Sequence, residues 1–247
     1  MKAAILQPTY LPWCGYFDLI DQVDTFVILD NVQFEKRSWQ HRNRIKTATG
    51  LQWLTVPVLV HGRFQQLISD VEICDPGFAR KHVRAIEWNY RGAEYFDRYF
   101  PEIPQLLTCA PGTRLIELNL RVLRWLCSAL QVQSQFVRAS ELRATGKRTE
   151  LLANICVEVG ATEYLSPLGS AEYLLAEMDA MTSRGIEVSF QHFEHPVYRQ
   201  LHGPFAPYAS ALDLLLNEGP NALEIIRSGR RPAYLPCEVA LPQAAEA

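Results

Sequence analysis

The residues of this 247-residue chain that are best suited to chemistry begin in the segment 7–18, directly after a short apolar run at 2–6. The segment contains two prolines, a glycine and four aromatic rings. Aromatic and proline side chains form a rigid, amphipathic wall at small entropic cost. We therefore expect its polar and aromatic side chains to shape a substrate pocket, namely those of Gln7, Tyr10, Trp13 and Tyr16. Gly15 would leave backbone N–H groups free to meet an anion at the start of a helix.

A second set of polar side chains follows the next apolar run, 26–29. Asp30 and Gln33 are suited to orient a polar substrate or to accept a proton. Arg42 offers a bidentate fork for a carboxylate or phosphate, and Asn43 supplies both donors and an acceptor. His61, in a glycine-bearing loop after another apolar run, is a candidate general base.

These assignments make Asp30, Gln33, Arg42 and His61 the candidate catalytic residues and Asn43 a candidate substrate ligand. A solvated loop with a helix cap at Asp30 would explain the same segment without chemistry. That simpler interpretation is preferred for the neighbouring charged residues Glu35, Lys36, Arg37 and Arg44.

Cysteine and histidine offer further chemistry. Cys14 lies beside a predicted helix start, where a lowered thiol pKa would let it accept an acyl group. His192 and His195 have the spacing of two metal ligands but lack a clear third, so no metal site is expected. The six cysteines form no Cys-x-x-Cys pair, which predicts reduced thiols.

The elements that must position these side chains follow a strand–helix–strand order. Apolar runs at 2–6 and 26–29 flank the helical spacing of 16–23, and continuous apolar strands indicate a parallel sheet covered on both faces. Further runs at 135–137, 164–166 and 186–190 continue this rhythm between helical patterns. The expected fold is therefore α/β, a three-layer, mostly parallel sheet with helices on both faces. Ligands of such sheets bind beyond the carboxyl ends of strands, where both polar segments lie.

Between these runs, 51–60 and 68–73 are predicted strands, and 113–130 is a predicted amphipathic helix. No internal repeat or linker interrupts the chain. A single α/β domain over 1–232 is expected, followed by an Ala- and Pro-rich C-terminal tail at 233–247.

The composition argues against several classes of protein. Hydrophobic residues make up 48% and charged residues 21%, and the formal net charge is −3. Such a chain presents no broad positive field to DNA or anionic lipid. No apolar run reaches the roughly 18 residues that cross a bilayer, and the first residues do not form a signal peptide. A cytoplasmic protein without membrane or DNA partners is expected.

Four motifs occur in the first part of the chain, namely Gln7-Pro8, Trp13-x-Gly15-Tyr16-Phe17-Asp18, Asp30-x-x-Gln33-Phe34 and Trp39-x-x-Arg42-Asn43-x-Ile45. Together they resemble those of the WbqC-like protein family, which is known from bacterial O-antigen and other biosynthetic gene clusters. The resemblance covers nearly the whole chain, through Tyr164-Leu165-Ser166, Tyr198-x-Gln200, Phe205-x-Pro207-Tyr208 and Ser210-x-Leu212-Asp213. It adds Tyr198 and Gln200 to the expected substrate-binding residues.

The order of strand, proline-bearing loop, helix and apolar strand is also similar to nucleotidyltransferase-type (HUP) folds such as pantothenate synthetases. Those enzymes adenylate a carboxylate with ATP and then form an amide, and a His-x-Gly-His motif meets the nucleotide phosphates. Trp13 and Tyr16 occupy the histidine positions here, which argues against adenylyl transfer. No obligatory cofactor is evident, and ATP with Mg²⁺ stays an open alternative.

The family resemblance implies amide formation, because members have been suggested to be glycine or other aminoacyl transferases. The first hypothesis is an acyl or aminoacyl transferase, or an amide ligase, acting on an amine of an amino sugar or another specialised metabolite. Its partners would be that small molecule and an acyl donor on a carrier protein, coenzyme A or tRNA. The alternatives are a non-catalytic ligand-binding protein of a biosynthetic complex, and a cyclase, dehydratase or hydrolase acting on a carrier-bound intermediate.

Overall fold

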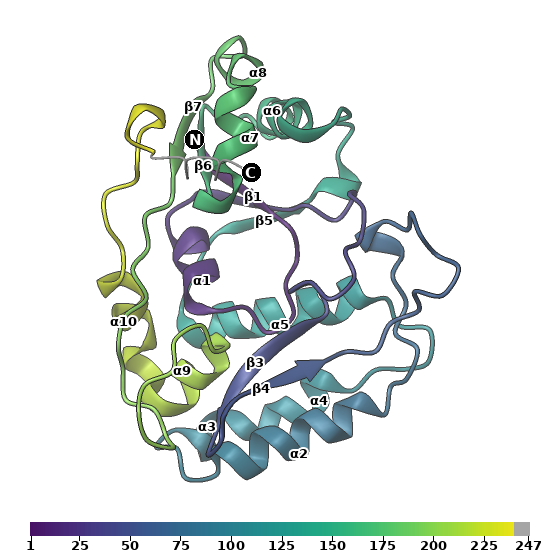
Figure 1. The fold of residues 1–247 in the computed structure, drawn as a ribbon, viewed down its shortest axis with the longest axis vertical. Helices are drawn as coiled ribbons and strands as arrows, with labels where there is room; N and C mark the ends of the chain where they lie inside the picture. The colour runs from purple at the N-terminus through teal and green to yellow at the C-terminus, as the bar shows by residue number, and fades with distance from the viewer. Residues whose placement is uncertain (240–247) are drawn as a thin grey trace, which may run out of the picture.

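The computed structural model describes residues 1–239, so part of the predicted tail lies outside the described residues. A five-stranded parallel sheet forms its centre, in the order β5-β2-β1-β6-β7 (Figure 1). Its strands are β1 (Lys2–Leu6), β2 (Thr25–Ile28), β5 (Gln135–Arg138), β6 (Glu163–Ser166) and β7 (Glu187–Phe190). The predicted α/β class with a parallel sheet is confirmed.

Helices cover both faces of this sheet. One face packs against α1 (Cys14–Asp21) and α5 (Leu115–Leu130), and the other against α6 (Arg148–Glu158), α7 (Ala171–Ala176) and α8 (Asp179–Thr182). Side chains alternate along β1, so Ala4 joins the first core while Ala3 and Ile5 join the second. The three layers therefore follow from strands that are apolar on both sides.

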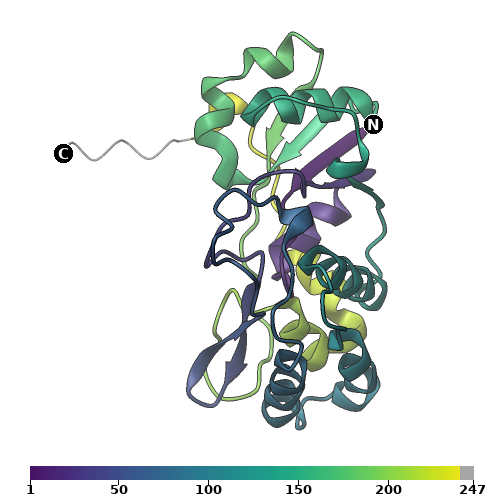
Figure 2. The ribbon, with the colours of Figure 1, turned by 90° about the vertical axis from the view of Figure 1, so that its right-hand side faces the viewer.

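The segment between β2 and β5 carries an antiparallel hairpin of β3 (Arg42–Thr47) and β4 (Gly50–Thr55). Helices α2 (Phe78–Tyr90), α3 (Phe96–Tyr99) and α4 (Ile103–Leu107) follow it, and α9 (Ala211–Glu218) and α10 (Ala222–Ser228) join the same part of the molecule. Figures 1 and 2 place the hairpin and α2 at the end of the molecule opposite α6–α8.

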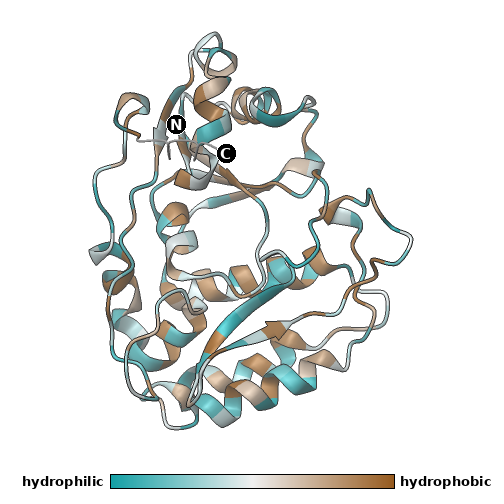
Figure 3. Ribbon diagram, in the orientation of Figure 1, coloured by the Kyte–Doolittle hydropathy of each residue, from teal (hydrophilic) through white to brown (hydrophobic). Residues whose placement is uncertain are grey.

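The sequence did not predict β3, which is largely hydrophilic (Figure 3). Two predicted strands also differ from the structure. The strand expected at 51–60 ends at Thr55, before Pro57, because proline cannot continue the hydrogen-bonded ladder. The strand expected at 68–73 begins instead with a 3₁₀ turn, Ile68–Asp70.

The connections of the sheet diverge at its centre. β1 runs through α1 to β2 on one side, whereas its other neighbour, β6, runs through α7 and α8 to β7 on the opposite side. Connections that leave adjacent parallel strands in opposite directions open a crevice beyond their carboxyl ends. The fold thus leaves a crevice beyond Leu6 and Ser166, where ligands of such sheets bind.

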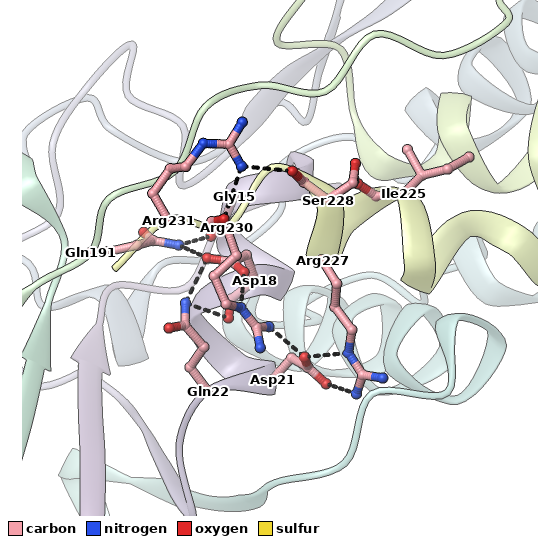
Figure 4. Close-up of polar contacts among 10 residues, drawn as sticks. All are labelled: Gly15, Asp18, Asp21, Gln22, Gln191, Ile225, Arg227, Ser228, Arg230 and Arg231. Carbon is pink, nitrogen blue, oxygen red and sulfur yellow. Dashed lines mark hydrogen bonds and ion pairs between the residues drawn. The ribbon is translucent and has the colours of Figure 1, made fainter. Parts of the chain in front are cut away.

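A buried carboxylate fixes α1, the helix that borders this crevice (Figure 4). Asp18 is fully buried and accepts hydrogen bonds from Nε2 of Gln22 and Nε2 of Gln191, both at 2.7 Å. Its other oxygen accepts from Nε of Arg230 at 2.8 Å. Asp21, one turn later, pairs with Arg227 and Arg230. These contacts tie α1 to the end of β7 and to the segment after α10.

Replacing Asp18 by alanine is therefore expected to lower the free energy of unfolding by about 3 kcal/mol, because buried donors lose their charged acceptor. The value lies at the low end for broken buried pairs since Arg230 stays partly solvated. Urea unfolding followed by circular dichroism measures it. Asp97→Ala, at an exposed aspartate on α3, is the matched control. Equal losses in the two variants would show that Asp18 is not an anchor.

Candidate functional site

A cavity of about 560 Å³ lies at the carboxyl edge of the sheet, where β1 and β6 diverge. The end of β1, the loop after it and the first turn of α1 line it with Leu6, Gln7, Thr9, Trp13 and Tyr16. The segment before and within β3 contributes Glu35, Ser38, Trp39, Gln40 and Arg44. Pro167, just after β6, and Tyr208, before α9, complete the lining. The size is that of a small-molecule site.

The indole of Trp13 folds back over the first turn of α1. A β-carbon added at Gly15 would lie only 2.3 Å from Cη2 of this ring, so the close contact depends on glycine. The ring also lies against Tyr208 at a centroid distance of 5.4 Å, and His195 stacks on it at 5.9 Å. The ring of Trp13 therefore packs directly against Gly15.

Two carboxamides join the opposite walls of the cavity. Nε2 of Gln40 donates to Oε1 of Gln7 at 2.8 Å. The phenol of Tyr16 donates to the backbone carbonyl oxygen of Gln7 at 3.1 Å. Gln40 is only 2% exposed, and its backbone carbonyl oxygen accepts a hydrogen bond from Nδ2 of Asn119 at 2.8 Å. The carboxamide of Gln7 is thereby held in one orientation.

Two of the predicted ligands support the loop after β1 from behind. Nδ2 of Asn43, which is buried, donates to the carbonyl oxygen of Leu11 at 2.8 Å. Leu11 adopts the left-handed conformation, with φ of 46°, which this bond helps to stabilise. Tyr10 is fully buried, and its hydroxyl bonds Nδ1 of His82 at 2.9 Å. Neither Asn43 nor Tyr10 lines the cavity.

Tyr198 and Gln200 meet at the buried carboxylate of Asp213. It accepts from the hydroxyl of Tyr90 at 2.6 Å and from Tyr198 and Gln200 at 2.9 Å each. Burial raises the pKa of Asp213, while these hydrogen bonds act in the opposite direction. Gln200 also bonds both the N–H and the carbonyl of Ala206. The network therefore shapes the segment that presents Tyr208 to the cavity.

The four candidate catalytic residues lie outside the cavity. Asp30 is buried where β2 ends, and it accepts from Arg138 Nε and from the N–H and hydroxyl of Ser140 at 2.8–2.9 Å. Gln33 is exposed and donates to the carbonyl of Phe64 at 3.0 Å. His61 is exposed in the nearby loop. Their assignment to catalysis stays a prediction, and the structure gives Asp30 a bracing role between β2 and β5.

Arg42, the fourth candidate, lies on β3 with its guanidinium carbon 4.4 Å from the ring centre of Trp53. Arg44, two residues along, does line the cavity, and so does Glu35. The sequence had favoured a solvated loop for both. Strand spacing places Arg42 and Arg44 on one face of β3, but it does not distinguish Arg44, which lines the cavity, from Arg42, which does not.

Among residues 1–239, no three His, Cys, Asp or Glu side chains gather in a way that could hold a metal ion. His192 bonds the hydroxyl of Tyr234 at 3.0 Å, and Nδ1 of His195 lies 2.9 Å from the Pro196 carbonyl oxygen. Within the described range, no helix has the length and apolar character needed to span a bilayer.

The fold and the cavity define an α/β protein with a cavity of small-molecule size at the switch point of a parallel sheet. The chain belongs to the WbqC-like protein family, whose model matches residues 7–225. It is 40% identical over 231 residues to the uncharacterized protein Rv1507c of Mycobacterium tuberculosis, a match that covers 93% of this chain and 99% of that protein. No solved structure matches the chain.

Gly15→Ala is expected to displace the Trp13 ring without unfolding the protein, at a cost of about 1–3 kcal/mol. Fluorine NMR of protein labelled with 5-fluorotryptophan measures this, with the Trp13 signal assigned through Trp13→Phe. The Trp13 signal should move while signals of distant tryptophans stay. Gly92→Ala is the control, because an added β-carbon there meets no atom within 4 Å. An unmoved Trp13 signal would contradict the packing described.

Cys14 is fully buried, and burial raises the pKa of its thiol, with the charge of Asp213 acting in the same direction. The acyl-acceptor role considered for it requires a thiolate. Iodoacetamide at pH 8 should therefore modify the exposed Cys74 and Cys237 of the native protein but leave Cys14 unmodified, as peptide mass spectrometry measures. Denatured protein, in which all six cysteines react, is the control. Labelling of Cys14 at the rate of Cys74 would restore it as a candidate nucleophile.

Proposed function

We propose that this chain is a biosynthetic acyl or aminoacyl transferase that forms an amide on an amine of an amino sugar or another specialised metabolite. The observation that carries the proposal is the cavity itself. It brings a carboxylate (Glu35), a guanidinium (Arg44) and an oriented carboxamide (Gln7) to one small-molecule site with aromatic walls. The suggested aminoacyl transfer by members of the family supports the same reaction class.

These three groups match the charges that change during aminolysis. The amine nitrogen attacks the acyl carbon, a C–N bond forms, and the bond to the donor's oxygen or sulfur breaks. Glu35 holds the amine and accepts its proton, which passes to the leaving group. Arg44 donates to the carbonyl oxygen as negative charge develops there. The Nε2 of Gln7 makes no hydrogen bond within residues 1–239, so it is available to orient the acceptor.

The proposal needs no covalent enzyme intermediate, since positioning two bound reactants supplies most of the rate gain. The proposed reaction consumes no ATP. Trp13 and Tyr16, at the positions of the phosphate-binding histidines in similar folds, are engaged with Gly15 and with the Gln7 carbonyl.

The test is product formation by the purified chain. It is incubated with aminoacyl-coenzyme A, aminoacyl-tRNA and aminoacylated carrier protein, each with a panel of amino-sugar acceptors, and products are analysed by mass spectrometry. We expect an amide heavier than the amine by the acyl group less one hydrogen. Glu35→Gln and Arg44→Gln should each lower the rate by about 100-fold or more. Glu87→Gln, at an exposed glutamate on α2, should leave it unchanged.

Binding of an acceptor in the cavity without product from any donor would overturn the proposal in favour of a ligand-binding protein. Release of the free acid, with no amide formed, would favour a hydrolase. Equal rates in the Glu35 and Glu87 variants would exclude Glu35 as the base.

A further inference from the structure

Four side chains form a continuous surface at the mouth of the cavity, which we call the tryptophan–arginine platform: Trp39, Arg42, Arg44 and Trp53. In the hairpin, Arg44 pairs with Trp53, and Asn43 pairs with Leu54. Asn43 and Leu54 are buried, so Arg42, Arg44 and Trp53 share the opposite, outer face. Trp39 joins them from the segment before β3.

The platform is held together by stacking. The rings of Trp39 and Trp53 lie 5.2 Å apart at an angle of 38°, and the guanidinium carbon of Arg44 is 5.4 Å from each. Arg42 lies over Trp53 at 4.4 Å. The two indoles nevertheless stay 46% and 42% exposed. Large exposed aromatic surface of this kind is suited to a planar ligand.

Neither arginine of the platform is paired with a carboxylate of residues 1–239. Within the described part of the chain, neither Arg42 nor Arg44 forms a salt bridge, and the buried Nε of each has no hydrogen-bond partner. Two guanidinium groups two residues apart on one strand face repel each other. An unpaired buried donor also costs free energy until a partner arrives. Both features favour a bound anion.

The platform continues directly into the cavity, since Trp39 and Arg44 line it while Arg42 and Trp53 lie outside. A ligand bound on the platform would therefore extend one end into the cavity. Stacking surfaces beside guanidinium forks recognise a base and its phosphate together. A phosphate alone would use the arginines and leave the exposed indoles unused.

We propose that the tryptophan–arginine platform binds the nucleotide part of the acyl donor, with the base on the indoles and the phosphate on Arg42, so that Arg44, which lines the cavity, stays next to the acyl carbonyl. The identification of this ligand as a donor rests on the proposed function, whereas nucleotide binding itself does not. Two donors share this chemistry, namely coenzyme A and the 3′ end of an aminoacylated RNA. A phosphopantetheine group on a carrier protein has the phosphate but no base.

Isothermal titration of the full chain tests the proposal with three probes: coenzyme A, the RNA trinucleotide CCA carrying a 5′-phosphate, and 4′-phosphopantetheine. We expect one of the two nucleotide probes to bind at least tenfold more tightly than phosphopantetheine, and the tighter one identifies the donor. The double variant Arg42→Gln/Arg44→Gln should weaken its binding at least tenfold and reduce the salt dependence of the binding constant. Trp53→Leu should weaken the nucleotide probe but leave phosphopantetheine unchanged.

Arg124→Gln/Arg143→Gln removes the same charge at two exposed arginines and is the matched control, expected to bind as the parent chain does. Circular dichroism of each variant establishes that it is folded. No binding of either nucleotide at millimolar concentration would overturn the proposal, as would equal binding of phosphopantetheine or an equal loss in the control. Nucleotide binding without acyl transfer would refute the proposed function but support the nucleotide site on the platform. Acyl transfer without nucleotide binding would support the proposed function but refute the nucleotide site.

Discussion

The divergence of the chain at the centre of the parallel sheet is the constraint on which the rest of this structure depends. β1 and β6 are neighbours, yet their connections leave in opposite directions, so nothing in the sheet closes the space beyond Leu6 and Ser166. The crossovers of parallel strands are almost always right-handed, which places successive helices on opposite faces when the direction reverses. The segment inserted between β2 and β5 then supplies the missing wall, and Gln40 joins this wall to Gln7.

The walls of the cavity are irregular backbone, and irregular backbone needs partners for its polar groups. Buried side chains supply them. Asn43 satisfies the carbonyl of Leu11, Gln200 satisfies both backbone groups of Ala206, and Lys46 donates to the carbonyls of Gly203 and Pro204. Asp18 holds helix α1 in place by accepting hydrogen bonds from the side chains of Gln22, Gln191 and Arg230. Residues of catalytic type thus make the loops rigid, and a rigid wall is what positioning of two reactants requires.

Some polar side chains support the loops and others line the cavity, and this difference limits what could be predicted from the sequence. The sheet was predictable because its strands β1 and β2 are buried on both faces and therefore largely apolar. The strand β3, with Arg42 and Arg44 on its outer face, has no such apolar run and was missed. Residue types in the two polar segments predicted a site at the carboxyl edge, where the structure has a cavity. The direction of each side chain depends on long-range pairing, which spacing does not encode. Asp30 turns to Arg138 and Ser140, more than 100 residues away in the chain, whereas Arg44 turns into the cavity.

The proposed site separates recognition from reaction. The platform, which lies partly outside the cavity, carries stacking surface and two arginines without a salt bridge to residues 1–239, which suit a large carrier group that is common to many donors. The cavity carries Glu35 and Arg44 within aromatic walls, which suit the small reacting groups. Arg44 belongs to both, because its guanidinium touches Trp39 and Trp53 while it lines the cavity. Binding of the carrier would therefore fix the guanidinium that is proposed to stabilise the developing oxyanion. Binding energy from the non-reacting part of a substrate is used in this way when it orders a group that acts in the transition state.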